Sequence, residues 1–269
     1  MKVRGIITLL TDFGLKDVYV SAMKGVILSI SSSVIFVDLS HNVSRYNILQ
    51  GAFLLSTVSS YFPKGTIHLA VIDPGVGTFR RRIAIKGKRC LYVGPDNGLL
   101  LLAAKAEGIE KAVEIKGERF IPPFISTTFE GRDIFAPVAA NLLNGLSIED
   151  LGPEIHDLVE PIFIEPEVKG DKIMGLVVHI DRFGNLITNI SKRQLENLRV
   201  IDGVFFEVNI GSVSKVIPFC RTYSDVPDNF PLVIVGSSGF LEVSVHLGSA
   251  MALFKAVIGS KVDVIISTD

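Results

Sequence analysis

The first third of the chain alternates strand patterns with helix patterns, and this alternation limits the folds open to it. Short apolar runs typical of buried strands occupy residues 5–10, 34–37 and 66–72, and segments with apolar residues at helical spacing separate them. Parallel strands are joined by crossover helices of this kind, and their sheets are covered on both faces. The alternation therefore predicts an α/β N-terminal domain with a mainly parallel sheet.

An aspartate stands at the end of each of these strand patterns, namely Asp12, Asp38 and Asp73. In an open parallel sheet, the carboxyl ends of the strands border the crevice where ligands bind. Three acids at that edge favour a ligand site, although aspartate is also common in turns and Asp38 fits a turn or a helix cap equally well. We expect Asp17 to cap the helix that follows the first strand.

The loop after the third strand carries the most chemical information: Asp73-Pro74-Gly75-Val76-Gly77-Thr78-Phe79-Arg80-Arg81-Arg82. Its glycines allow a tight turn and a close approach to another group. A carboxylate at Asp73 and a guanidinium at Arg80 could bind and orient a polar reactant. The alternative is a plain turn with a surface salt bridge, and we expect the three arginines to be solvated strand ends.

Further elements are expected before this domain ends. They are two strands, a turn and two helices: 83–85, 91–93, 94–98, 99–107 and 134–143. Thr127 or Thr128 lies in the N-cap region of the last helix, and Pro137 indicates that this helix begins only shortly before it. Glu130 then lies near a helix start, where a carboxylate complements the dipole and where an electronegative ligand group is also favoured.

The pattern changes character after residue 152. Prolines and glutamates make 152–171 an extended connection, which divides the chain into an α/β domain (1–160), a linker (161–171) and a β-rich domain (172–269). One helix is expected near 192–198, and short strand patterns separated by turn residues make up most of the rest: 175–180, 186–190, 204–208, 213–218, 231–235 and 240–245. They predict an all-β C-terminal domain, either a barrel or a sandwich, in which His179 and His246 are structural.

Composition excludes several classes of function. The net charge is −1 without a stripe of Arg or Lys, so no nucleic-acid partner is expected. No apolar run reaches membrane-spanning length and no signal peptide is recognisable, so we expect a cytoplasmic protein without a membrane partner. Cys90 and Cys220 lack metal spacing, and Gly75-Val76-Gly77 completes neither a dinucleotide fingerprint nor a P-loop. Chemistry on a small molecule, without a metal or cofactor, is what remains.

Five motifs in this chain resemble, in order and spacing, the S-adenosylmethionine hydroxide adenosyltransferases, relatives of the fluorinase and chlorinase. They are Thr11-Asp12-Phe13-Gly14, Asp73-Pro74-Gly75-Val76-Gly77-Thr78, Gly94-Pro95-Asp96-Asn97-Gly98, residues 129–137 and Asp181-Arg182-Phe183-Gly184-Asn185. The resemblance implies a homotrimer that binds S-adenosylmethionine between the N-terminal domain of one subunit and the C-terminal domain of its neighbour. It also implies attack of water or hydroxide on C5′, which yields adenosine and methionine without a cofactor.

The same resemblance implies roles for individual residues. Asp12 would hold the ribose hydroxyls, Asp17 and Asp181 would lie near the amino-acid part, and Tyr46 would form an aromatic wall. The other positions that match substrate contacts are Phe129, Phe183 and Asn185 (the last two at the adenine), Ser237 and Ser238 in a turn, and, as weaker matches, Glu242 and the backbone near Val245.

The catalytic positions implied by the resemblance are Asp73, Arg80 and Glu130. Members of the hydroxide branch have His where this chain has Glu130, and halogenases have Tyr where it has Asp73. Because two carboxylates near one arginine do not both ionise easily, we expect Glu130 to bond Arg80 or the water, and we consider it a candidate general base. Two other functions stay open, a non-catalytic adenosine or S-adenosylmethionine binding protein and a halogenase, which a carboxylate at Asp73 disfavours because it repels halide.

Overall fold

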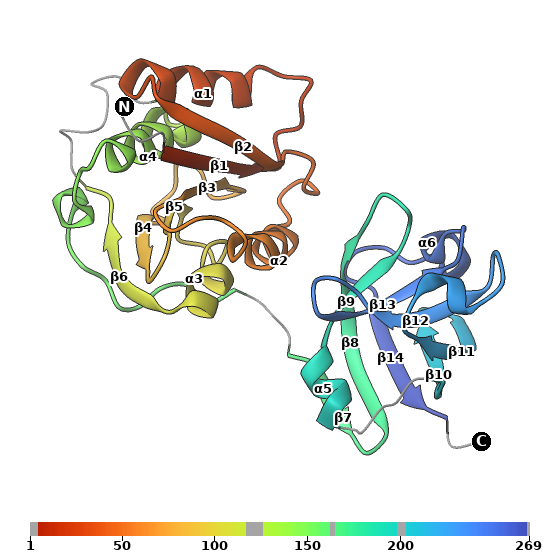
Figure 1. The fold of residues 1–269 in the computed structure, drawn as a ribbon. Helices are drawn as coiled ribbons and strands as arrows, with labels where there is room; N and C mark the ends of the chain where they lie inside the picture. The colour runs from red at the N-terminus through yellow and green to blue at the C-terminus, as the bar shows by residue number, and fades with distance from the viewer. Residues whose placement is uncertain (1–4, 117–125, 162–164, 198–202, 268–269) are drawn as a thin grey trace. The chain divides into compact units, whose positions relative to one another are not determined.

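The computed structural model describes residues 5–116, 126–161, 165–197 and 203–267, and the chain separates into two compact units, Met1–Phe163 and Ile164–Asp269 (Figure 1). The first unit is a sheet covered by helices and the second is a closed barrel. The predicted fold class, an α/β domain with a mainly parallel sheet plus an all-β domain, is confirmed.

The first unit contains a six-stranded sheet in the order β2-β1-β3-β5-β4-β6. Its strands are β1 (Gly5–Thr11), β2 (Val34–Ser40), β3 (Ile67–Val71), β4 (Arg82–Gly87), β5 (Leu91–Pro95) and β6 (Ile109–Glu114). Neighbours among β2, β1, β3 and β5 pair in parallel, whereas β4 runs antiparallel to both β5 and β6. The β4–β5 hairpin therefore returns the chain to the edge at which β3 ends.

Helices cover both faces of this sheet (Figure 1). They are α1 (Tyr19–Ile30), α2 (Ile48–Ser59), α3 (Leu101–Glu107) and α4 (Ala136–Leu143), with a π-helical segment at Gly131–Phe135 and a 3-10 turn at Ile148–Leu151. Leu9 of β1 packs with Met23 of α1 and with α4, whereas its neighbour Leu10 packs with Leu55 of α2 and with α3. Adjacent strand residues point to opposite faces, so each apolar strand forms part of two cores.

Two expectations for the helices and strands of this unit were wrong. Asp17 does not cap α1, because the helix begins at Tyr19 after Val18 and no side chain caps it. Asp38 does not follow β2 but lies inside it, because the strand continues to Ser40. Its carboxylate lies 2.7 Å from Lys24 Nζ of α1 and 3.2 Å from His41 Nε2, so its role is to hold the helix against the strand.

In its described residues, the second unit is a β-barrel with two short α-helices and a 3-10 turn at Tyr223–Asp225. Its elements are β7 (Glu167–Lys169), β8 (Lys172–Ile180), β9 (Leu186–Ser191), α5 (Lys192–Asn197), β10 (Phe205–Ile210), β11 (Val213–Cys220), β12 (Pro231–Val235), β13 (Phe240–Val245), α6 (Ala250–Phe254) and β14 (Lys261–Ile266). Pairing of β14 with β8 closes a ring of seven strands around a core that includes Phe206, Val233 and Val264, with β7 outside the ring. Of the two predicted architectures, the barrel is the observed one. The short strand β7 lies in the stretch expected to be only a connection.

His68 of β3 is fully buried in the first unit. Its Nδ1 lies 2.8 Å from Thr8 Oγ1 of β1, and its ring stacks on Tyr92 of β5 with the centroids 5.1 Å apart. Burial lowers the pKa of His68 from 6.5 to about 4, because the imidazolium would lose its hydration. In this pH range the unfolded chain therefore binds a proton that the folded chain excludes.

We predict that the free energy of unfolding falls between pH 6.5 and pH 4 by about 3 kcal/mol because of His68 alone. Its stabilising effect is fully present above pH 6.5 and is lost as the pH falls toward the depressed folded-state pKa. The free energy of unfolding is measured with urea at several pH values. Plotted against pH, it should change less steeply for His68→Gln than for the wild type. His156→Gln, at a side chain that is 84% exposed, is the control and should keep the wild-type slope. Equal slopes for wild type and His68→Gln would exclude this origin.

Candidate active site

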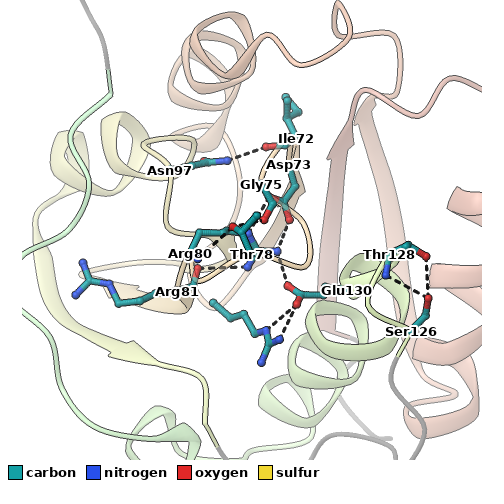
Figure 2. A network of polar contacts seen from close by, with 11 residues as sticks. Ile72, Asp73, Gly75, Thr78, Arg80, Arg81, Asn97, Ser126, Thr128 and Glu130 are labelled. Atoms are coloured by element: carbon teal, nitrogen blue, oxygen red, sulfur yellow. Dashed lines mark hydrogen bonds and ion pairs between the residues drawn. The ribbon is translucent and has the colours of Figure 1, made fainter.

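The site begins where β3 ends. Ile72 is fully buried, and its carbonyl oxygen accepts a hydrogen bond of 2.9 Å from Asn97 Nδ2 (Figure 2). Asn97 belongs to the turn after β5, and its Oδ1 accepts from the backbone of Leu99. This turn, which was expected before a helix and is also one of the five family motifs, fixes the backbone immediately before Asp73.

The loop that follows Asp73 folds back on itself and packs against the segment before α4. Thr78 Oγ1 donates to the carbonyl of Gly75 at 2.7 Å. Gly77 has φ of 77°, and a Cβ at this position would lie 2.6 Å from the carbonyl oxygen of Thr127. Glycine is therefore required at position 77 by both its backbone conformation and its close neighbour.

Three segments meet in a buried array of charges (Figure 2). Arg80 donates to both carboxylate oxygens of Asp73, with 2.8 Å from Nε to Oδ1, and its Nη2 also donates to Glu130 Oε2. The side chains of Asp73, Arg80 and Glu130 are only 6%, 11% and 2% exposed. The expected contact between Glu130 and Arg80 is present, whereas an exposed Glu130 and a surface salt bridge at Asp73 are both excluded.

Arg82 completes this array, although we expected all three arginines to be solvated strand ends. Its Nε and Nη2 donate to Glu130 Oε1 at 3.0 and 2.6 Å. Arg81 binds Asp96 at 2.8 Å and Asp157 at 2.6 Å. The expectation failed because these partners lie 15 to 76 residues away in sequence and come together only in the fold. A signal did exist, since two buried acids and a single arginine leave one negative charge unbalanced.

The formal charges of the array cancel, and the pKa shifts of Glu130 and Arg80 both favour the ionised form. Burial alone would raise the pKa of Glu130, but Arg82 and Arg80 hold it below the usual range for glutamate. Burial would lower the pKa of Arg80, but Asp73 and Glu130 raise it above the usual value for arginine. The Arg80 guanidinium also lies over the ring of Phe135, 5.4 Å from its centroid. Two carboxylates and two guanidinium groups thus balance.

A cavity of about 170 Å³ lies beside the array. Its lining residues are Phe13, Tyr19, Val71, Asp73, Val76, Thr128, Phe129, Glu130 and Gly131. Phe13, Tyr19 and Phe129 contact one another with ring centroids 5.2 to 5.8 Å apart. The cavity therefore combines an aromatic wall with two carboxylates, a setting suited to a small polar reactant and to a cation. Sequence reasoning anticipated Phe129 here but missed Phe13 and Tyr19.

Three residues expected at the substrate do not belong to the described lining of this cavity: Asp12, Asp17 and Tyr46. Asp12 Oδ2 accepts a 2.8 Å hydrogen bond from the backbone N–H of Tyr46. Tyr46 has φ of 62°, and its side chain is 69% exposed. Asp17 is exposed in the segment before α1. Asp12 and Tyr46 thus form one group joined by a hydrogen bond.

The remaining expected residues lie in the second unit. Asp181 Oδ1 accepts from the backbone N–H groups of Phe183 and Asn185, both at 2.9 Å, and Asn185 Nδ2 donates to Asp181 Oδ2 at the same distance. These bonds fold the loop between β8 and β9 so that Phe183 is 74% exposed while Asn185 is buried. Asp181 therefore shapes the loop that carries both predicted adenine contacts, of which only Phe183 is exposed.

Glu242 lies buried on β13 of the same unit. Its Oε1 accepts from Tyr223 Oη at 2.7 Å and from Ser244 Oγ at 2.9 Å. Burial and the neighbouring Glu242 carboxylate raise the pKa of Tyr223 well above its usual range. Ser237 and Ser238 lie in the turn between β12 and β13, and Val245 ends β13. Glu242 thus has two hydroxyl partners within the barrel.

The described residues contain neither a metal cluster nor a membrane helix. Within 5–116, 126–161, 165–197 and 203–267, no three His, Cys, Asp or Glu side chains are grouped to hold a metal ion. Across the same ranges, no helix has the length and apolar character needed to span a bilayer.

Comparison with known protein families matches both units of the chain. Residues 7–152 match the SAM hydroxide adenosyltransferase N-terminal domain, and residues 175–263 match the C-terminal domain of the same family. The chain belongs to the SAM hydroxide adenosyltransferase family. The resemblance stated from the five sequence motifs is thereby confirmed.

Individual relatives match almost the whole chain. A protein of Methanocaldococcus jannaschii named (R)-S-adenosyl-L-methionine hydrolase is 38% identical, covering 97% of this chain and 95% of the relative. One of the same name from Thermus thermophilus is 40% identical, covering 90% and 92%. A fluorinase of Nocardia brasiliensis is 28% identical and covers 97% of each chain. A crystal structure of an uncharacterized conserved protein from Thermotoga maritima is similar with a TM-score of 0.92 at 35% identity, covering 96% and 99%.

We predict that Gly77→Ala destabilises the protein by about 1 to 3 kcal/mol, because the new Cβ meets the Thr127 carbonyl at a backbone conformation unfavourable for alanine. The measurement is urea unfolding at pH 7. Gly25→Ala is the matched control: this glycine lies on the exposed side of α1 with no atom near the added Cβ, so alanine should stabilise by about 0.5 to 1 kcal/mol. Equal effects at the two positions would show that the loop at Gly77 is not held as described.

Proposed function

We propose that this protein hydrolyses S-adenosyl-L-methionine to adenosine and L-methionine, with water or hydroxide attacking C5′. The observation that carries the proposal is the similarity to three relatives named (R)-S-adenosyl-L-methionine hydrolase, which are 36–40% identical over 90–97% of this chain. Fluorinases are more distant, at 26–28% identity. The charge array and the cavity beside it supply a setting in which this reaction is chemically reasonable.

The reaction needs no general acid for its leaving group, but it needs precise positioning of the attacking water. S-adenosylmethionine is a sulfonium cation, so methionine leaves as a neutral thioether when the C5′–S bond breaks and its electron pair returns to sulfur. The new O–C5′ bond forms from a water that must give up a proton. Holding that water in line with the C–S bond, away from bulk solvent, lowers the barrier through proximity and desolvation.

Asp73 is the residue best placed to accept the water's proton. Its carboxylate lines the cavity and is held at both oxygens by Arg80, which fixes its orientation. Arg80 is outside the described lining of the cavity, so it acts on the water through the Asp73 carboxylate that it orients. Glu130 lines the same cavity and holds Arg80 from its other side. The aromatic wall of Phe13, Tyr19 and Phe129 excludes water and favours the sulfonium cation.

The same features disfavour use of a halide as the nucleophile. Two carboxylates line the cavity, and an approaching anion would meet their negative charge in a setting of low solvent exposure. Water carries no net charge and can donate hydrogen bonds to a carboxylate. The proposal is therefore hydrolysis rather than halogenation.

In this proposal the protein is a homotrimer, and residues from the second unit of a neighbouring subunit complete the substrate site. Asp12 holds the ribose and Tyr46 lies along it, while Asp17 and Asp181 lie near the amino-acid part. Phe183 and Asn185 contact adenine, and the other second-unit contacts are Ser237, Ser238, Glu242 and Val245. Exposure of Phe183 and Tyr46 supports these roles, because exposed aromatic rings are available for a ligand or a neighbouring subunit.

The decisive assay uses S-adenosylmethionine in ¹⁸O-labelled water, with each sulfur epimer separately and with or without chloride. We predict adenosine that carries one label, an equal amount of methionine, faster turnover of the (R) epimer and no chlorinated nucleoside. Asp73→Asn should reduce kcat by about 10² to 10⁴-fold, since the carboxylate that accepts the proton is lost. A nucleoside that stays bound without turnover would instead support a binding protein, and a 5′-chloro product would support a halogenase.

Mixing two impaired variants tests whether neighbouring subunits share the site. Asp73→Asn alters only the first unit and Asn185→Ala only the second, and each alone should be strongly impaired. If substrate binds between two chains, the two variants are co-expressed at equal levels and mix in one cyclic assembly. About a quarter of the sites should then combine an unaltered first unit with an unaltered second unit, and these sites should be active. A site formed within one chain would give no recovery. Size-exclusion chromatography with light scattering measures the assembly itself.

A further inference from the structure

Glu130 and Asp73 both line the cavity, but their hydrogen-bonding environments differ. Glu130 accepts three N–H donors from two guanidinium groups, one from Arg80 and two from Arg82. Asp73 accepts two donors, both from Arg80. A carboxylate that accepts more charged hydrogen bonds is a weaker base, because those bonds stabilise its ionised form. The two acids are therefore not equivalent.

Arg82 reaches this site from outside the reactive cavity. It begins β4, where its backbone carbonyl accepts a 2.8 Å hydrogen bond from Ile115, and its side chain is 35% exposed. It is not among the described residues that line the cavity. Without Arg82, Glu130 and Asp73 would share the single charge of Arg80, and one buried negative charge would be left without compensation.

We propose that Arg82 is a positioning residue: it neutralises Glu130 and thereby makes Glu130 a fixed anchor for Arg80, which leaves Asp73 as the base. This inference rests on the proposed hydrolysis. Glu130 acts through Arg80 rather than on the water, and Arg82 acts through Glu130. The charge at Arg82 should therefore matter only while position 130 carries a negative charge.

A double-mutant cycle tests this dependence. We expect Arg82→Gln to lower kcat by about tenfold or more, because a buried carboxylate loses its partner and competes with Asp73 for Arg80. Arg82→Lys should recover part of the loss, since it restores the charge but not the two-point contact. In a Glu130→Gln background, the further change Arg82→Gln should alter kcat by less than about twofold. Arg89→Gln is the control, since that arginine binds backbone carbonyls of Ser60 and Phe62.

Several outcomes would overturn the inference. If Arg82→Gln lowers kcat by the same factor in the wild type and in the Glu130→Gln variant, Arg82 acts independently of Glu130. Abolition of activity by Glu130→Gln, with loss of the ionisation that the wild type shows on the acid side of its pH–kcat profile, would make Glu130 the base. Unfolding midpoints of all variants, compared with the wild type, separate loss of folding from loss of positioning.

A measurement without turnover separates this inference from the proposed function. If the wild type produces no adenosine, the proposed hydrolysis fails, but the Arg82–Glu130 pairing can still be followed. The ¹³C carboxyl signal that disappears in Glu130→Gln should titrate at higher pH in Arg82→Gln than in the wild type. An unchanged titration would overturn the neutralising role of Arg82 whether or not the protein hydrolyses S-adenosylmethionine.

Discussion

The sharing of one buried guanidinium, Arg80, by two carboxylates is the interaction on which the site depends. Removing a charge from water costs several kcal/mol unless it is paired, so each member of such an array requires the others. Asp73 follows β3, Arg80 precedes β4, and Glu130 directly precedes the π-helical segment. The loop between β3 and β4 is thus held to the segment before the π-helix, 50 residues further along from Arg80 to Glu130, by charge pairing as well as by the apolar core.

The same constraint explains features around the array. Asn97 fixes the carbonyl of Ile72 just before the first carboxylate, and Gly77 allows the loop to pass against Thr127 just before the second. Phe135, at the end of the π-helical segment, lies beneath the Arg80 guanidinium and covers its face. Single π-helical turns are frequent at functional sites. Here the segment provides the ring on the face of the cation while Glu130 binds its edge.

The spacing of apolar residues predicted most of the fold, because it shows which side chains are buried. The runs at β1, β2 and β3 are apolar, and the segments between them have apolar residues at helical spacing. This alternation is sufficient to predict an α/β sheet. β6 was missed because Ile109, Glu110 and Lys111 at its start are partly or largely exposed on an edge strand, and charged edge residues hide a strand pattern. β14 was missed although its buried Val262 and Val264 alternate with more exposed residues, so that signal was readable.

The candidate site was predictable only in part, for a different reason. Asp73 and Arg80 stand seven residues apart in one loop, so their pairing could be inferred locally. Arg82 and Glu130 stand 48 residues apart, and no local pattern joins them; the only signal was the negative charge that two acids and one arginine leave unbalanced. The sequence predicted both Asp12 and Asp38 at strand ends. In the structure, Asp12 accepts a hydrogen bond from the backbone of Tyr46, whereas Asp38 binds Lys24 of α1. Only the residue-by-residue length of β2 distinguishes these two cases.

The arrangement of the array, more than its net charge, is what fits a cationic substrate. Two carboxylates and two arginines sum to zero, so the site offers no net attraction at long range. However, Asp73 and Glu130 line the cavity, while Arg80 and Arg82 are not among its described lining residues. The carboxylates of both ion pairs thus border the cavity, whereas the two guanidinium groups are outside its described lining. In the proposed reaction, such an orientation would stabilise a sulfonium and a water that is losing a proton, and it would oppose a halide. An uncompensated carboxylate would bind the cation more strongly, but it would also bind a proton more readily and lose that orientation.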